Sequence, residues 1–363
     1  MRAVIAGGGT AGHVNPALAL AGALGGDEVT FIGTTRGAEA MLVPAAGHDL
    51  VTIDVRGFDR SRPASIVATG IVAARAVRTA RRTLRRLAPD VVVGMGGYVS
   101  LPVCLAARAS AIPIVLHEQN IVFGLANRVC KPFARRVAVS FAESLRSAGP
   151  RGVFVGNPVA AELTEARDAD RKEHGIARFG LERGRKTLLV FGGSQGAQRI
   201  NDAAAQIASR WRSRGDRQLV HIAGRSGPAP APVVDVAGEE GLIYRVVEFV
   251  DRMVDAYAVA DLALCRGGAT TVAELGAVGL PAIIVPYPYH RDRQQQLHGE
   301  VLERAGAAVV IGDGEVTGER VALEVERLFS QEGALTRMSR AATSLGTPDA
   351  AQRLALVVRE TAA

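Results

Sequence analysis

The chain has 363 residues, a length that favours two domains of ordinary size. Its 48% hydrophobic and 22% charged residues exclude a largely disordered chain, and 4% aromatic residues disfavour a protein that stacks single-stranded nucleic acid. The net charge of +7 is uneven, because residues 1–157 carry 18 basic and 9 acidic residues (+9) and residues 158–363 carry 25 and 27 (−2). An anionic partner is therefore expected at the first half.

Neither a disulfide framework nor a membrane span is predicted. Three cysteines, Cys104, Cys130 and Cys265, are too few and too far apart for linked disulfides or a zinc cluster. The N-terminal MRAVIAGGG lacks the anatomy of a signal peptide. The uncharged stretch 91–107 contains three glycines and a proline and is short for a bilayer. These features favour a soluble, cytoplasmic protein.

Short apolar runs alternate with helical patterns along the whole chain. Strands are predicted at 3–6, 29–32, 91–93 and 114–116, and again at 187–191, around 221, and at 262–264, 282–285 and 307–311. This alternation predicts parallel sheets with helices on both faces. The fold class is therefore α/β.

A weak repeat indicates two such units. Residues 3–13 and 187–197 both predict a strand, a glycine-rich turn and a helix start. We place one domain at 1–157 and a second at 158–346, with a C-terminal helix at 347–363 that crosses back onto the first. The charged segment 162–186 is interpreted as a linker, and its Asp168-Ala169-Asp170 as a solvated charge run rather than a metal clamp.

The first glycine turn, Gly7 to His13, follows a strand and opens a helix. It matches G-x-G-x-x-G, in which backbone amides approach a phosphate. A dinucleotide site would need an acidic residue after the second strand, where Arg36 stands, so an NADP-dependent oxidoreductase remains an alternative, as does a tight turn without ligand. His13, in the first helical turn at the carboxyl edge of the sheet, is a candidate catalytic residue or a packing residue.

Three further glycine turns follow strands. Residues 94–100 (GMGGYVS) lie in the same half as the first turn, and two such turns favour a phosphorylated ligand such as a diphosphate, although tight packing explains them as well. Residues 192–196 (GGSQG) lack the lysine of a P-loop, which disfavours ATP chemistry. Residues 266–274 (RGGATTVAE) offer amides, hydroxyls and Glu274, a combination that suits a nucleotide sugar, although a capped helix start explains them as well.

Residues 66–87 predict an amphipathic helix with a basic face. Six arginines fall within an arc of roughly 140°, and alanine, valine and leucine side chains occupy the opposite side. The arginines are Arg75, Arg78, Arg81, Arg82, Arg85 and Arg86. An ordinary sheet-covering helix explains the pattern, but a basic face without acidic residues also predicts contact with an anionic membrane surface.

Motifs in chain order resemble the MurG family, the peripheral-membrane N-acetylglucosaminyltransferases of peptidoglycan synthesis. They are GGGTAGHVNPALA (7–19), GMGGYVSLP (94–102), HEQN (117–120), VGNPV (155–159), GGSQGAQRIN (192–201) and RGGATTVAELGAVGLPAIIVPYP with DRQQ (266–295). The resemblance implies a GT-B fold, in which two Rossmann-like domains face each other across the active-site cleft. It implies transfer of GlcNAc from UDP-GlcNAc to the 4-hydroxyl of the MurNAc of lipid I, which yields lipid II for cell wall growth, cell shape and division.

The resemblance also assigns roles to residues. The second domain would bind UDP-GlcNAc and the first the undecaprenyl-linked acceptor, at the cytoplasmic face of the membrane, without nucleic acid, metal or cofactor. Donor contacts would be Thr10, Ala11, Gly12, Asn120, Ser194, Val250, Ala269, Thr270, Thr271, Val272, Ala273, Glu274 and Gln295. Loops for the acceptor diphosphate would include Gly9, Gly96, Gly97 and Tyr98. The general base would be His13, with Glu118 as the second candidate.

Two positions depart from the family pattern. Ala11 stands where the family usually has glycine, and Ala160 stands where it often has an arginine that binds the donor. Arg199 is a candidate to supply the missing positive charge. A non-catalytic, membrane-docked nucleotide-sugar binder is the remaining alternative, and it would bind UDP-GlcNAc without turnover.

Overall fold

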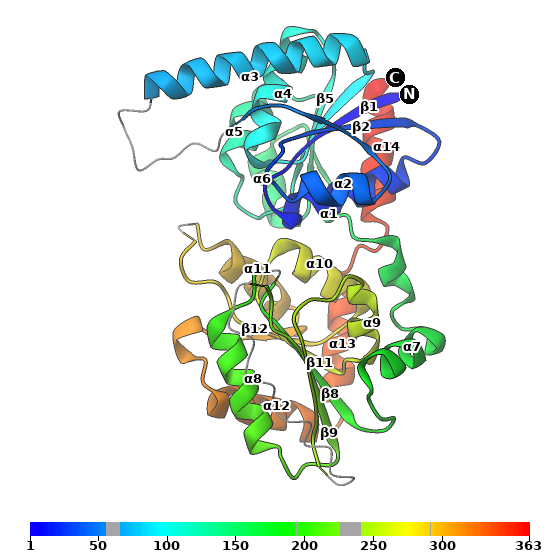
Figure 1. The fold of residues 1–363 in the computed structure, drawn as a ribbon, viewed down its shortest axis with the longest axis vertical. Helices are drawn as coiled ribbons and strands as arrows, with labels where there is room; N and C mark the ends of the chain where they lie inside the picture. Colours follow the sequence, from blue (N-terminus) through cyan, green and yellow to red (C-terminus); the bar gives the residue numbers. More distant parts are fainter. Residues whose placement is uncertain (56–65, 194, 226–240, 291) are drawn as a thin grey trace. The chain divides into compact units, whose positions relative to one another are not determined.

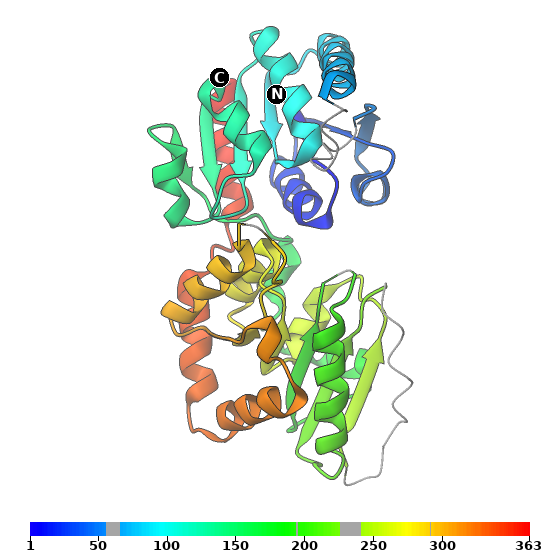
Figure 2. The ribbon, with the colours of Figure 1, turned by 90° about the vertical axis from the view of Figure 1, so that its left-hand side faces the viewer.

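The computed structural model describes residues 1–55, 66–193, 195–225, 241–290 and 292–363, and residues 66–73 by their backbone alone. The chain divides into two compact units (Figures 1 and 2). Unit 1 comprises Met1–Ala160 and Thr347–Ala363, and unit 2 comprises Ala161–Gly346. Each unit is described by itself below.

Unit 1 is built on a parallel sheet of seven strands in the order β3-β2-β1-β4-β5-β6-β7. The strands are β1 (Arg2–Ala6), β2 (Glu28–Gly33), β3 (Asp49–Thr52), β4 (Val91–Gly94), β5 (Ile114–Glu118), β6 (Arg136–Val139) and β7 (Gly152–Phe154). Its helices are α1 (Ala11–Ala23), α2 (Glu39–Ala45), α3 (Ile66–Leu87), α4 (Gly97–Ala109), α5 (Leu125–Cys130), α6 (Leu145–Ala148) and α14 (Ala350–Ala362).

Both faces of this sheet are buried, as the apolar strands require. Successive side chains of a strand point to opposite faces, so Val4 of β1 belongs to a core with α3 and α4. Its neighbour Ile5 belongs to the core on the other face, with α1 and with Leu354 of α14. The C-terminal helix is thus part of the unit 1 core.

Unit 2 contains a parallel sheet of six strands in the order β10-β9-β8-β11-β12-β13. The strands are β8 (Lys186–Phe191), β9 (Arg217–Ile222), β10 (Ile243–Val247), β11 (Leu262–Cys265), β12 (Ala282–Ile284) and β13 (Ala308–Val310). Its helices are α7 (Ala169–Phe179), α8 (Gln198–Arg210), α9 (Met253–Val259), α10 (Ala269–Val278), α11 (Gln294–Arg304), α12 (Gly318–Ser330) and α13 (Ala334–Leu345). The predicted class, two doubly wound α/β units with parallel sheets, is confirmed.

The strand orders place the glycine turns where such folds bind ligands. In unit 1 the order reverses between β1 and β4, and the turns at 7–12 and 94–97 follow these two strands. In unit 2 it reverses between β8 and β11, which the turns at 192–197 and 266–268 follow. Ligands of doubly wound sheets bind outside the carboxyl ends of strands at such a switch point.

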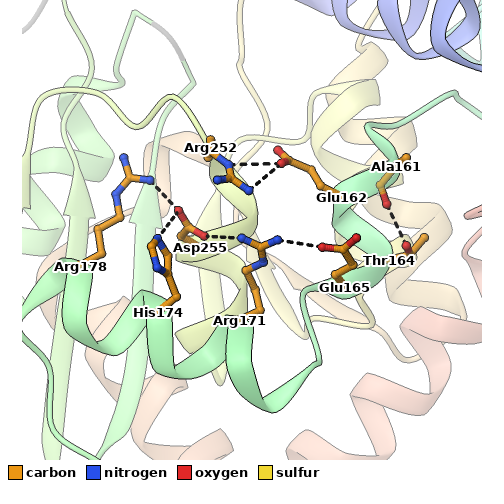
Figure 3. Close-up of polar contacts among 9 residues, drawn as sticks. All are labelled: Ala161, Glu162, Thr164, Glu165, Arg171, His174, Arg178, Arg252 and Asp255. Atoms are coloured by element: carbon orange, nitrogen blue, oxygen red, sulfur yellow. Dashed lines mark hydrogen bonds and ion pairs between the residues drawn. The ribbon is translucent and has the colours of Figure 1, made fainter.

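The interpretation of 162–186 as a plain linker is wrong. Within it, η4 (Ala161–Glu165) and α7 form part of unit 2, and α7 packs against α9. The charged pattern of this segment was misleading, because two of its arginines pair with a buried carboxylate instead of facing solvent alone. Asp255 of α9 is fully buried, 2.6 Å from Nη1 of Arg178 and 3.5 Å from Nη1 of Arg171 (Figure 3).

Helix α3 carries the predicted basic face. All six of its arginines are exposed, while Ala80 and Leu84 are buried against α4 and the sheet. No carboxylate of the described residues lies within ion-pair distance of these arginines. Among the described helices, none combines the length and apolar character that crossing a membrane requires.

Candidate active site

His13 lies in the first turn of α1, directly after the first glycine turn. Its Nδ1 is 3.1 Å from Oγ1 of Thr10, the residue that precedes the helix. Burial lowers the pKa of the imidazole, partly offset by the charge of Glu39. The ring is therefore neutral near pH 7, the state in which a histidine can accept a proton. When Thr10 accepts from Nδ1–H, the free lone pair is at Nε2.

Nε2 of His13 lies beside the second glycine turn. Gly96 has a φ of +86°, and a Cβ there would lie 3.3 Å from Nε2 of His13 and 3.5 Å from Oε1 of Gln119. Gln119 is buried, and its Nε2 donates to the Met95 carbonyl at 2.9 Å. Its Oε1 has no hydrogen-bond partner within the part of the chain that the structure describes. Sequence analysis missed Gln119, although it lies within the HEQN motif.

Both carboxylate oxygens of Glu118, the second candidate base, accept hydrogen bonds from the segment that follows β5. Its Oε1 accepts from the backbone and side-chain amides of Asn120 at 3.0 and 3.1 Å. Its Oε2 accepts from the Gly124 amide and from Nδ2 of Asn127, both at 2.9 Å. Burial nevertheless raises the pKa of this carboxyl group. The four bonds indicate a residue that shapes the loop after β5.

The first glycine turn encloses a carboxylate of the chain itself. Glu39 is buried, and its Oε2 accepts from the Gly9 amide at 2.8 Å. Its Oε1 accepts from the amide and hydroxyl of Thr34 at 2.9 and 2.8 Å. The Gly9 amide is thus occupied, and a carboxylate here would repel the phosphates of a dinucleotide. This geometry disfavours the NADP alternative and the expected role of Gly9 toward an acceptor diphosphate.

No carboxylate of the described residues bonds to the second turn, at 94–97. Gly97 begins α4 with a φ of +75°, and a Cβ there would lie 2.6 Å from the Gly8 carbonyl oxygen. The two turns are therefore in close contact, and only glycine fits. Tyr98 lies next to Gly9, with its hydroxyl 3.5 Å from Oγ1 of Thr34. The amides at the start of α4 are the better candidates for an anion in unit 1.

In unit 2, the predicted donor residues Ala269 to Glu274 form the first half of α10, after the buried strand β11. Burial raises the pKa of Glu274 to about 7, although a bond from Tyr257 acts in the opposite direction. The Tyr257 hydroxyl donates to Oε2 of Glu274 at 2.7 Å. Sequence analysis missed Tyr257, which carries no local motif.

Other predicted donor residues are placed as follows. Val250 is buried after β10, and Gln295 is the second residue of α11, where its Oε1 accepts from the Tyr287 amide at 2.9 Å. Ser194 lies outside the described residues. Arg199 pairs with Asp313 at 3.1 Å, and the same carboxylate pairs with Arg266 at 2.6 Å. No cluster of three or more metal-ligating side chains is found among the described residues.

Comparison with known proteins identifies the class. Residues 3–139 match the Glycosyltransferase family 28 N-terminal domain, and residues 187–354 match the Glycosyltransferase family 28 C-terminal domain. With its two parallel-sheet units, the chain is a glycosyltransferase of the GT-B fold. The structure of a UDP-GlcNAc 2-epimerase from Neisseria meningitidis shares this fold. It superposes with a TM-score of 0.69 at 13% sequence identity, and the match covers 99% of both chains.

Full-length relatives define the particular family. A UDP-N-acetylglucosamine–N-acetylmuramyl-(pentapeptide) pyrophosphoryl-undecaprenol N-acetylglucosamine transferase of Nocardioides sp. is 43% identical, over 99% of this chain and 98% of that protein. The protein of the same name from Halothermothrix orenii is 39% identical, over 100% of this chain and 99% of that protein. The crystal structure of Acinetobacter baumannii MurG has a TM-score of 0.78 at 26% identity, over 99% of both chains. The chain therefore belongs to the MurG family of N-acetylglucosaminyltransferases.

Proposed function

We propose that the chain transfers GlcNAc from UDP-GlcNAc to the 4-hydroxyl of the MurNAc of lipid I and so produces lipid II. The full-length relatives named for this transfer support the substrates. The observation that carries the chemistry is His13, a neutral imidazole beside a glycine turn at the switch point of unit 1.

The reaction is a single displacement with inversion. The acceptor 4-hydroxyl oxygen forms a bond to C1 of GlcNAc while the bond between C1 and the diphosphate oxygen breaks. The hydroxyl proton passes to Nε2 of His13, and UDP leaves with the bonding electron pair. A positioned base contributes about 10²- to 10⁴-fold in rate. The amides at the start of α10 stabilise the charge that develops on the diphosphate.

The two units take different substrates in this proposal. Unit 2 binds UDP-GlcNAc through α10, with Glu274 accepting hydroxyls of the donor and Val250 and Gln295 near the nucleotide. Unit 1 binds lipid I, with the amides of Gly96 and Gly97 at its diphosphate. Asn120 keeps its side-chain carbonyl for substrate, since its amide is bonded to Glu118. Gly9 is left out because Glu39 holds its amide.

Unit 1 also meets the membrane in this proposal. The six exposed arginines of α3, without carboxylate partners among the described residues, support docking to anionic headgroups at the cytoplasmic face. Each basic side chain near such a surface contributes up to about 1 kcal/mol. The protein would be peripheral, with an acceptor whose reactive sugar lies close to the bilayer.

Release of UDP from UDP-GlcNAc tests the proposal, with and without a lipid I analogue. Acceptor-dependent release together with a disaccharide product is expected. Binding of UDP-GlcNAc without turnover would instead support a nucleotide-sugar binder. Tight NADPH binding without affinity for UDP would favour the oxidoreductase and refute the transferase.

A further inference from the structure

Tyr257 is a fully buried tyrosine whose hydroxyl reaches the donor-site carboxylate. It lies on α9 with no exposed surface, and its ring packs edge-on against Phe191 at the end of β8, with centroids 6.0 Å apart. Its hydroxyl donates to Oε2 of Glu274 on α10 at 2.7 Å. A buried tyrosine usually finds one hydrogen-bond partner, and here that partner is a residue proposed to bind substrate.

Helix α9 is fixed in place by its neighbours. Two residues before Tyr257, the buried Asp255 accepts from Arg178 of α7 and lies within ion-pair distance of Arg171 and His174 (Figure 3). Arg252, just before α9, bonds to Glu162 of η4 at 3.1 Å. Since Asp255 and Phe191 restrain α9 and the ring, the Tyr257 hydroxyl has little freedom to leave Glu274.

Within the part of the chain that the structure describes, one oxygen of Glu274 accepts a hydrogen bond and the other does not. Oε2 receives the tyrosine, and Oε1 has no donor among the residues that the structure describes. A phenol donates one hydrogen bond without adding a positive charge, so the carboxylate stays a strong acceptor. An arginine or lysine in this position would neutralise that charge.

We propose that Tyr257 is a positioning residue for UDP-GlcNAc, which holds Oε2 of Glu274 so that Oε1 accepts a hydroxyl of the donor. The inference rests on the proposed role of Glu274 and adds a residue that does not itself touch substrate. The bond also favours the ionised carboxylate, since it acts against the burial that raises the pKa of Glu274.

The first test is Tyr257→Phe, which removes the hydroxyl and keeps the ring. The KM for UDP-GlcNAc should rise by roughly 5- to 10-fold, while kcat at saturating donor stays within about 2-fold, because the lost bond serves ground-state and transition-state binding alike. Tyr244→Phe is the matched control. Tyr244 is also a buried tyrosine of unit 2, and its hydroxyl lies 2.8 Å from Nδ1 of His221, a residue with no proposed role in the site.

A double-mutant cycle separates positioning from a structural effect. In a Glu274→Gln background, adding Tyr257→Phe should change KM by less than about 2-fold, since the carboxylate to be positioned is gone. An equal loss in both backgrounds, an unchanged KM in Tyr257→Phe, or an equal loss in Tyr244→Phe would overturn the inference. If Glu274→Gln alone leaves KM unchanged, the proposed donor role of Glu274 fails, a result distinct from failure of Tyr257 alone.

Discussion

Replacing His13 by alanine tests the proposed base most directly. The ring is held by Thr10 at 3.1 Å, and burial lowers its pKa, so wild-type protein has a neutral imidazole throughout the physiological range. Loss of a positioned base predicts a fall in kcat of about 10²-fold or more, with a change in the KM for UDP-GlcNAc of less than roughly 3-fold. The assay is steady-state UDP release with a soluble lipid I analogue. Wild-type activity should decrease as pH falls through the lowered pKa.

Glu118→Gln provides the comparison that decides between the two candidates. An amide keeps one acceptor oxygen, so the loop after β5 loses bonds from Gly124 or Asn120. Glu118→Gln should therefore lower the free energy of unfolding by about 1–3 kcal/mol, whereas His13→Ala should change it little. Near-normal kcat in His13→Ala, together with a stable but inactive Glu118→Gln protein, would refute the assignment and make Glu118 the base.

Three further predictions concern the rest of the molecule. Burial raises the pKa of Glu274 to about 7, against the opposing effect of the Tyr257 hydrogen bond. The KM for UDP-GlcNAc should therefore rise as pH falls from 8 to 6, because the carboxylate that accepts donor hydroxyls becomes protonated, and a Glu274→Gln protein should lose this dependence. In urea unfolding, Asp255→Asn should lower the free energy of unfolding by about 1–3 kcal/mol, whereas the exposed Asp170→Asn should lower it by less than about 0.5 kcal/mol. Equal effects would contradict a stabilising role for the ion pair between Asp255 and Arg178 of α7. Binding to anionic vesicles should weaken as the salt concentration rises and when four arginines of α3 are replaced together by glutamine. Turnover of a soluble acceptor should persist in that variant. A parallel loss of this turnover would mean that the helix is structural. The replaced residues are Arg78, Arg81, Arg82 and Arg85.

Most central strands were predictable from sequence, whereas three of the four edge strands of the two described sheets were not; the edge strand β13 was predicted at 307–311. The strands β1, β4, β8 and β11 are buried on both faces, so each is a run of apolar residues. The missed strands β3, β7 and β10 are at the sheet edges and partly exposed. Polar residues begin and end β3, Arg245 interrupts β10, and β7 is only three residues long. The fourth missed strand, β6, is buried but only four residues long and begins at an exposed arginine.

The position of a candidate site residue could be predicted only where it depends on chain-local geometry. His13 follows a strand and a glycine turn, so its position at the carboxyl edge of the sheet could be inferred from order alone. Glu39 lies 30 residues from Gly9, and Tyr257 lies 17 residues from Glu274 on a different helix. Such pairs depend on how helices pack over the sheet, which a single sequence does not encode in any local pattern.

Glu118 and Glu274 show how surroundings give one residue type two tasks. Glu118 is the last residue of strand β5 and Glu274 lies in helix α10, which follows strand β11, and burial raises the pKa of each. Four donors from its own loop satisfy both oxygens of Glu118, so further bonding to substrate would have to displace one of them. Among the described residues, Glu274 has one hydrogen-bond donor, the Tyr257 hydroxyl at Oε2, and Oε1 has none. An incompletely bonded carboxylate costs stability unless a ligand completes it, and a donor with several hydroxyls supplies the missing bond.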